Sequence, residues 1–365
     1  MASDNMAALS ALFLWRRLGH WGCRRFWQFN MHKETCIVRT VGSYTKTSFA
    51  SLVVPLSCWK SVHMLGGLSV FAFSLFTKSA EDEEKKKEDE IILLLKKAKL
   101  NIMQGELEAA DRILHKAIRL AHESHNTQAI IYTYDMMANV AFLQGHLLNA
   151  EKLFKATLSF LLANATKEDD NAVIEISLKL ASIYAAQNRH DLAVQGFEFC
   201  TSTLEEKITK LDSLSAEEQD NTRLLLGLCL DSYARYQMSR SQLESACISY
   251  KKAIQISCEV QGLSHPQSLV LMNDMATVLD LQGHHDDAYK EMKKVLELAR
   301  ETGHPQHHAF LVNMAGILMH QGQHDTAQQF YKEALSLAQK LGDEIVVEKV
   351  QEGLEELEDR RRRNI

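Results

Sequence analysis

The sequence predicts an all-α protein made of repeated helical hairpins. Its 365 residues include only three prolines, Pro55, Pro266 and Pro305, and alanine and leucine are abundant. Because proline breaks helices whereas alanine and leucine favour them, we expect long helices. A turn residue followed by an alanine five positions later also recurs six times along the chain. Together these two observations indicate about six helical hairpins.

Each position of the repeat has a physical reason. A tight turn between two helices needs a positive φ, which glycine adopts freely and asparagine tolerates. The turn positions are Gly105, Gly145, Asn188, Ser241, Gly283 and Gly322, spaced by 40, 43, 53, 42 and 39 residues. Alanines let the two helices approach closely: before the turn these are Ala138, Ala181, Ala234, Ala276 and Ala315, and after it Ala110, Ala150, Ala193, Ala246, Ala288 and Ala327. Larger residues four positions on fill the space towards the next hairpin: Leu114, Phe154, Phe197, Tyr250, Met292 and Tyr331.

This pattern resembles the tetratricopeptide repeat over roughly residues 88–341. A single hairpin cannot bury its apolar faces, so the resemblance implies a stacked superhelix. The usual period is about 34 residues, and the longer one here is similar to that of kinesin light chains. His-Pro opens units there, and here we expect Pro266 and Pro305 to open equivalent helices. The largest spacing contains residues 205–221, which we interpret as an extended helix and a long loop.

Residues 1–55 have the composition of a mitochondrial transit peptide, and we expect them to be disordered. Arginines alternate with bulky apolar residues in this stretch, hydroxyl side chains follow, and acidic residues are almost absent. A secretory signal fits less well because arginines interrupt the first apolar segment. A basic tail without any targeting role is the alternative.

Residues 60–78 are predicted to form a single transmembrane helix. The sixteen residues 61–76 carry no formal charge. As a helix they reach about 24 Å, short of the hydrocarbon core of about 30 Å. Lys60 and Lys78 lengthen the usable span because their ammonium groups can reach the membrane surface. A second cleaved leader portion, or a helix packed on the array, are the alternatives.

Charge divides the chain into two parts. Residues 1–80 contain nine basic and two acidic residues, whereas the remainder is acidic and the net charge is −6. An acidic body is a poor match to nucleic acid. We expect residues 79–90 to be a charged spacer and residues 91–341 to form the array. If the basic side of the span stays in the matrix, the array lies in the intermembrane space.

Residues 342–365 are predicted to be a capping helix with a basic tail. Val347, Val350, Leu354 and Leu357 fall on one helical stripe. A solenoid needs such a terminal helix with one polar side. The arginines near the end suit a helix C-terminus, and contact of these arginines with lipid or a partner is the alternative.

The sequence contains no recognisable catalytic motif, and we predict no enzyme activity, no cofactor and no metal ligands. P-loop, nucleophile-elbow, dinucleotide-binding and H-E-x-x-H patterns are missing. Half of the sixteen histidines lie between residues 265 and 324, but His320 and His324 flank Gly322 and so are expected to straddle a turn. The seven cysteines match no metal spacing. The numerous carboxylates are interpreted as a solvated face.

A protein-binding groove is what the family resemblance implies instead. In tetratricopeptide arrays the first helix of each hairpin lines the groove. Applied to this chain, that gives Asp135, Asn139, Leu178, Ser182, Asp231, Arg235, Asn273 and Thr277. Receptors of this family for a C-terminal carboxylate have lysine where this chain has Asp135, four residues before Asn139. This mismatch argues against that role and favours an extended or helical protein segment.

The whole organisation resembles a family of mitochondrial inner-membrane tetratricopeptide repeat proteins. That resemblance implies a factor for the assembly and maintenance of respiratory complex III, acting near its Rieske iron–sulfur subunit. The alternative is a cargo-recognition adaptor with kinesin-light-chain-like repeats and no role in complex III.

Overall fold

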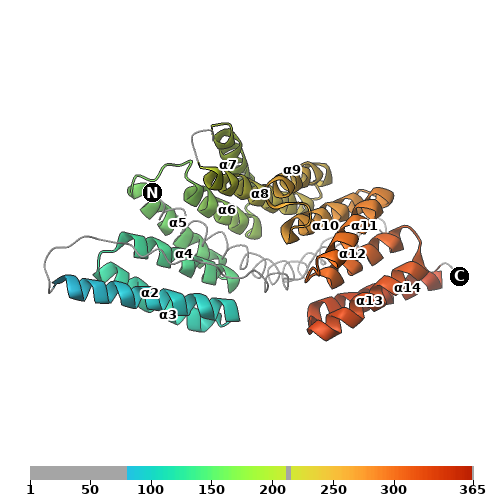
Figure 1. The fold of residues 1–365 in the computed structure, drawn as a ribbon, viewed down its shortest axis with the longest axis horizontal. Helices are drawn as coiled ribbons and strands as arrows, with labels where there is room; N and C mark the ends of the chain where they lie inside the picture. Colours follow the sequence, from blue (N-terminus) through green and yellow to red (C-terminus); the bar gives the residue numbers. More distant parts are fainter. Residues whose placement is uncertain (1–79, 211–214, 364–365) are drawn as a thin grey trace. The chain divides into compact units, whose positions relative to one another are not determined.

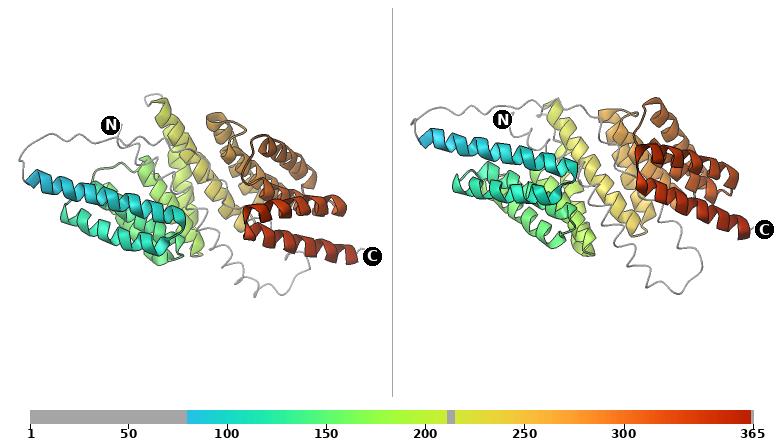
Figure 2. Two further views of the ribbon diagram at one scale, coloured as in Figure 1. Left: turned by 60° about the horizontal axis from the view of Figure 1, so that its bottom comes forward. Right: turned by 90° about the horizontal axis from the view of Figure 1, so that it is seen from below.

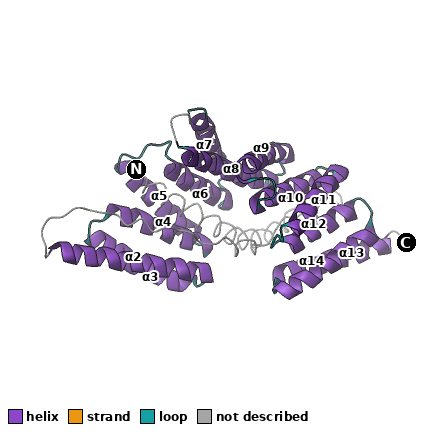
Figure 3. Ribbon diagram, viewed as in Figure 1, coloured by secondary structure: helices purple, strands orange, loops and turns teal. Residues whose placement is uncertain are grey.

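A computed structural model describes residues 80–210 and 215–363, which fold into helices joined by short turns with no strand among them (Figures 1 and 3). The chain divides into two compact units, whose described parts are residues 80–210 and residues 215–363. We call these unit 1 and unit 2. Unit 1 contains α2 (Ala80–Gln104), α3 (Leu107–Glu123), α4 (Thr127–Leu143), α5 (Leu147–Ala163), α6 (Asn171–Ala186) and α7 (His190–Ile208). Unit 2 contains α8 (Ala216–Ser239), α9 (Leu243–Gln261), α10 (Pro266–Leu281), α11 (His285–Glu301), α12 (His307–His320), α13 (His324–Leu341) and α14 (Glu344–Arg363).

Consecutive helices pair as antiparallel hairpins within each unit (Figure 2). Unit 1 has three hairpins, α2–α3, α4–α5 and α6–α7, and unit 2 has three more, α8–α9, α10–α11 and α12–α13. Each hairpin also packs on the next within its unit, for example α3 on α4 and α11 on α12. The prediction of an all-α fold with six helical hairpins is therefore confirmed.

The predicted turn positions are the points where the hairpins reverse. All six have a positive φ, including the non-glycine residues Asn188 (59°) and Ser241 (58°). At Gly145 and Gly283 a Cβ would meet nothing within 4 Å, so glycine is needed there for its backbone conformation rather than for space. Backbone carbonyl groups at the end of the first helix accept hydrogen bonds from the residues of the turn, as where His146 N donates to Ala141 O.

The predicted small and large positions form the core. All eleven alanines before and after the turns are completely buried, and the six large residues that follow are at most 5% exposed. At one contact the helices come closer still: a Cβ on Gly196 would lie 2.7 Å from the Cβ of Ala181. Close helix approach through small residues therefore sets the packing within each hairpin.

Three boundaries differ from expectation. The charged segment expected as a spacer is already helical from Ala80, because α2 continues through it. Pro266 is the first residue of α10, but Pro305 lies two residues before α12. There His307 N donates to His304 O, three residues back, which makes this segment a tight turn, whereas Leu269 N donates to His265 O, four residues back, at the start of α10. The additional residues between the third and fourth hairpins lengthen α7 and α8, and α8 begins with a capping box of Ser215 and Glu218.

The terminal helix α14 covers the last hairpin as predicted. Val350 and Leu357 are fully buried, whereas Val347 and Leu354 are only partly so. Val346, which the predicted stripe omitted, is 1% exposed. The buried face is therefore rotated slightly from the prediction, because α14 packs against both α12 and α13.

The predicted transit peptide and the predicted transmembrane helix over 60–78 lie outside the described residues. Among the helices that the structure describes, none combines the length and the apolar character needed to cross a lipid bilayer.

Candidate protein-binding surfaces

In unit 1 one of the predicted groove residues, Asp135, pairs with a buried cation. Lys179, on α6, is 2% exposed, and its Nζ lies 2.9 Å from Asp135 Oδ1 on α4 and 3.1 Å from Glu175 Oε1 on its own helix. The ammonium also lies over the ring of Phe154, 5.3 Å from its centroid. Two carboxylates and one cation thus tie the second hairpin to the third.

The charges in this cluster perturb one another. Burial raises the pKa of Glu175 to about 7, although the attraction of Lys179 opposes that rise. Burial alone would lower the pKa of Lys179, but the two carboxylates outweigh it and hold the pKa above its usual value. Lys179 therefore stays charged at neutral pH, while Glu175 titrates near neutrality.

The other predicted residues of unit 1 differ in their exposure. Asn139 is 4% exposed and its Nδ2 donates to Asp135 O (2.7 Å) and Oδ2 (3.0 Å). Ser182 is half-buried and donates to Leu178 O. Leu178 itself has no exposed surface, so we correct its assignment: it packs in the core beneath this face.

In unit 2 a second pair of carboxylates faces one cation. Asp231 and Arg235, one turn apart on α8, form an ion pair. Burial raises the pKa of Asp274 on α10 to about 7, against the attraction of Arg235. Asp231 is 2% exposed, and neither its Oδ1 nor the hydroxyl of the fully buried Tyr250 has a hydrogen-bond partner. Buried polar atoms left without a partner are uncommon in proteins and mark this cluster for attention.

Asn273 and Thr277 belong to a neighbouring set of hydrogen bonds. Asn313 Nδ2 on α12 donates to Asn273 Oδ1 (2.8 Å), and Asn273 Nδ2 donates to Asp274 Oδ1 (3.0 Å). Thr277 Oγ1 donates to Asn273 O. Asn273 has no exposed surface and connects α10 with α12, while Thr277, 6% exposed, bonds to the backbone of its own helix.

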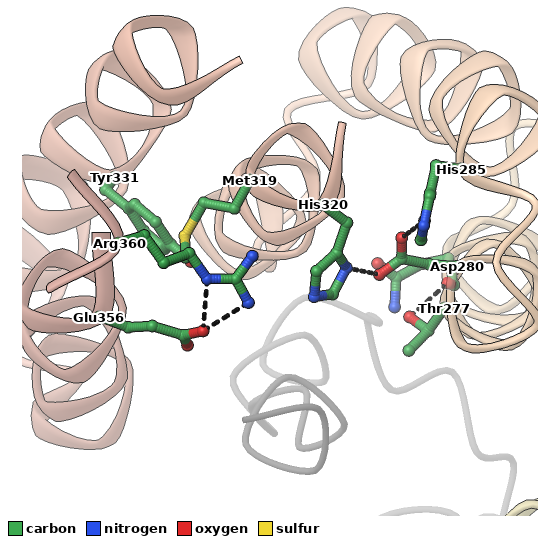
Figure 4. A network of polar contacts seen from close by, with 9 residues as sticks. Thr277, Asp280, His285, Met319, His320, Tyr331, Glu356 and Arg360 are labelled. Atoms are coloured by element: carbon green, nitrogen blue, oxygen red, sulfur yellow. Dashed lines mark hydrogen bonds and ion pairs between the residues drawn. The ribbon is translucent and has the colours of Figure 1, made fainter. Parts of the chain in front are cut away.

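A third polar cluster in unit 2 could hold a metal ion. Asp280 lies at the end of α10. Its Oδ1 is 2.7 Å from His285 Nδ1, and its Oδ2 is 2.7 Å from His320 Nδ1 (Figure 4). One ligand atom from each of the three residues lies within 4.8 Å of the other two. Each of the three comes from a different helix: α10, α11 and α12.

Comparisons with known proteins agree with this architecture. Residues 308–341 match the family model described as tetratricopeptide repeat. Tetratricopeptide repeat protein 19, mitochondrial, of Danio rerio is 59% identical over 296 residues, covering 80% of this chain and 73% of the relative. The Homo sapiens protein of the same name is 54% identical, covering 61% of this chain and 60% of the relative. The chain belongs to the tetratricopeptide repeat protein 19 family.

Solved structures support the fold of this family member. BtubC (BKLC) from P. vanneervenii aligns with a TM-score of 0.53 at 16% identity, covering 66% of this chain and 92% of that one. The apo form of RapI aligns with a TM-score of 0.54 at 15% identity, covering 72% and 71%. At such identities the likeness establishes the helical-repeat fold alone.

Family membership settles the coarse classification of this chain. Tetratricopeptide repeats are protein-interaction modules, so this tetratricopeptide repeat protein 19 relative is a scaffold of that kind. The names of its relatives also support the predicted mitochondrial location.

Sequence reasoning missed the partners that organise both surfaces. Glu175, Lys179 and Asp274 were not among the predicted residues, although a Glu-x-x-x-Lys pair inside the otherwise apolar α6 was a usable signal. The interpretation of the carboxylates as a solvated face was wrong for several of them. Glu175, Asp231 and Asp280 are at most 7% exposed because cations or imidazoles from the same or a neighbouring helix pair with them.

Proposed function

We propose that this chain is a membrane-tethered scaffold of the mitochondrial inner membrane that serves the assembly and maintenance of respiratory complex III. In this proposal the predicted helix over 60–78 is a single-pass anchor, the transit peptide directs import, and the array works in the intermembrane space. Its partner is complex III near the Rieske iron–sulfur subunit. The chain acts by binding and has no catalytic role.

The observation that carries the binding role is the paired arrangement on the first helices of the hairpins. In each unit two carboxylates surround one cation, Lys179 in unit 1 and Arg235 in unit 2. In each, one carboxyl has its pKa raised to about 7 by burial. A mixed, neutral-to-acidic face of this kind suits a protein segment that presents amide, lysine or arginine donors.

Within these faces, the proposed contact residues are those that retain exposed surface. Asp135, Ser182 and Arg235 are half-buried and can reach a partner directly. Asn139 and Asp231 are buried and would position Asp135 and Arg235 through the contacts described above. Asn273 and Thr277 are also buried and belong to the hydrogen bonds behind this face. Leu178 is part of the support.

Affinity isolation from mitochondria tests this proposal. Tagged protein with Asp135→Asn and Arg235→Gln should recover fewer complex III subunits than the unaltered chain. A control with Asp287→Asn, an exposed position on the second helix α11, should recover as many as the unaltered chain. The proposal fails if complex III subunits are absent from the isolate of the unaltered chain.

Protease protection tests the topology. After rupture of the outer membrane alone, the array should become sensitive to added protease. If the array is digested only after the inner membrane is opened, the proposed orientation is wrong. A cytosolic protein that is never imported would favour the alternative, a cargo-recognition adaptor with kinesin-light-chain-like repeats.

A further inference from the structure

We propose that Asp280, His285 and His320 form a zinc-binding site that joins three helices of unit 2. Each imidazole points its Nδ1 at a different oxygen of the carboxylate, and the two rings lie near one another (Figure 4). Two histidines and one carboxylate, with a water in the fourth position, are a ligand set that zinc uses in proteins. This inference does not depend on the proposed role in complex III.

The placement of the carboxylate is unusual for the repeat. Asp280 lies three residues before the turn glycine of its hairpin, and the equivalent positions in the other five hairpins are all apolar. These are Ile102, Phe142, Ala185, Met238 and Met319. Asp280 is only 7% exposed, so its charge is buried where four of the other five hairpins bury apolar side chains. A buried carboxylate needs compensation, which the imidazoles supply in part and a divalent cation would complete.

The ligand geometry is close to that required. A tetrahedral zinc ion with ligands at about 2.0–2.2 Å brings ligand atoms to about 3.4 Å from one another. Here one atom from each residue lies within 4.8 Å of the others, and the ring centroids are 5.4 Å apart. A shift of about 1 Å therefore closes the site. His285 is the first residue of α11 and His320 the last of α12, where side chains adjust more readily than in mid-helix.

The site is accessible from solvent while its carboxylate is shielded. The side chains of His285 and His320 are 33% and 23% exposed, which leaves room for the ion to enter and for a bound water. On binding, each imidazole moves its proton from Nδ1 to Nε2, and zinc replaces the two hydrogen bonds to Asp280. The ion would then connect α10, α11 and α12, and so fix the fifth hairpin on the sixth.

Zinc titration of the full-length protein in detergent, after removal of bound metal with a chelator, tests the site. The variants His285→Asn and His320→Asn remove one ligand each, while the asparagine amide can still donate to Asp280. His284→Asn is the matched control because this exposed neighbour does not contact the carboxylate. We expect the unaltered chain and the control to bind zinc alike. The two ligand variants should bind at least about 100-fold more weakly at this site.

Zinc binding should also raise the melting temperature of the unaltered chain and of the control, but not that of the ligand variants. Equal zinc binding by all four proteins, or no binding by the unaltered chain, would overturn the proposal and leave the cluster as a hydrogen-bonded connection. Zinc-edge X-ray absorption of the unaltered chain gives an answer even if a variant does not fold. Nitrogen and oxygen ligands with two imidazoles support the site, whereas sulfur ligands contradict it.

Discussion

Lys179 Nζ on α6 lies 2.9 Å from Asp135 Oδ1 on α4, although the two residues are separated by 44 positions in the sequence. The ammonium is almost completely buried and also forms an ion pair with Glu175. This contact spans two hairpins of unit 1 and also forms the polar face that we propose for partner binding. If this face binds the partner as proposed, stability and binding depend on the same charged group.

Replacement of Lys179 by methionine should destabilise the protein by about 3–5 kcal/mol, because it leaves Asp135 and Glu175 close together without their cation. Urea unfolding followed by circular dichroism measures the change. Lys155→Met is the matched control: Lys155 is 53% exposed, and its partner Glu151 keeps an ion pair with Arg189. The control should lose at most about 1 kcal/mol. Similar losses in both variants would contradict the structural role of Lys179.

Replacement of Glu175 by glutamine should stabilise the folded protein by an amount that depends on pH. The folded pKa of about 7 lies above the unfolded value near 4.3, so the folded state binds the proton more tightly. The contribution of Glu175 to stability is therefore most favourable below about pH 4.3 and falls as the pH rises to 7. Glu175→Gln should therefore increase the free energy of unfolding, relative to the unaltered chain, by more at pH 8 than at pH 5.

The matched control for this titration is Glu151→Gln. Burial would raise the pKa of Glu151, but hydrogen bonds from Lys155, Gln187 and Arg189 outweigh it and lower the pKa to about 2. Glu151 is therefore ionised in the folded state throughout this range, and its variant should show nearly the same difference at pH 5 and pH 8. A pH-independent difference for Glu175→Gln would contradict the raised pKa.

Gly283→Ala should destabilise the protein by about 1 kcal/mol, because the turn needs a positive φ that alanine adopts only with strain. No atom lies within 4 Å of the added methyl group, so the cost is conformational. Gly316→Ala is the control, since Gly316 lies within α12 and its methyl group also meets open space. There alanine should stabilise by about 0.5–1 kcal/mol. Thermal unfolding that ranks the two variants in the opposite order would exclude this explanation.

Gly353→Ala should loosen the terminal helix α14. Its Cβ would lie 2.5 Å from Tyr331 Cζ, and Tyr331 is held in place by a hydrogen bond from its hydroxyl to Met319 Sδ (Figure 4). Such overpacking costs about 1–3 kcal/mol. Hydrogen exchange should accelerate in α14 more than in α10. Unchanged exchange in α14 would show that the tyrosine ring moves aside freely.

The hairpins could be predicted from the sequence because their determinants are local. A turn residue followed by an alanine five positions later identifies a turn from the sequence alone, and all six positions predicted in this way have a positive φ in the structure. The boundary at Pro305 could not be predicted, since the His-Pro pair and its imidazole contact are the same at Pro266, where a helix does begin.

The polar faces could be predicted only in part. Placing Asp135, Asn139 and Ser182 on first helices needed only the repeat register. The contacts of Lys179 with Asp135 and of His320 with Asp280 join residues about one repeat apart, and which side chains meet depends on how the hairpins stack. The burial of Leu178 has the same origin, because helix rotation decides which residues remain exposed.

Site-specific photocrosslinking in mitochondria tests the central claim, that the first-helix face binds complex III. The crosslinking amino acid is placed at Ser182 on α6, and at Ser159 on the second helix α5 as a matched control, since both serines donate to their own helix backbone. We expect position 182 to crosslink to a complex III subunit, the Rieske protein first among them, and position 159 to give no such product. Crosslinks to complex III from position 159 alone, or from neither position, would contradict the account.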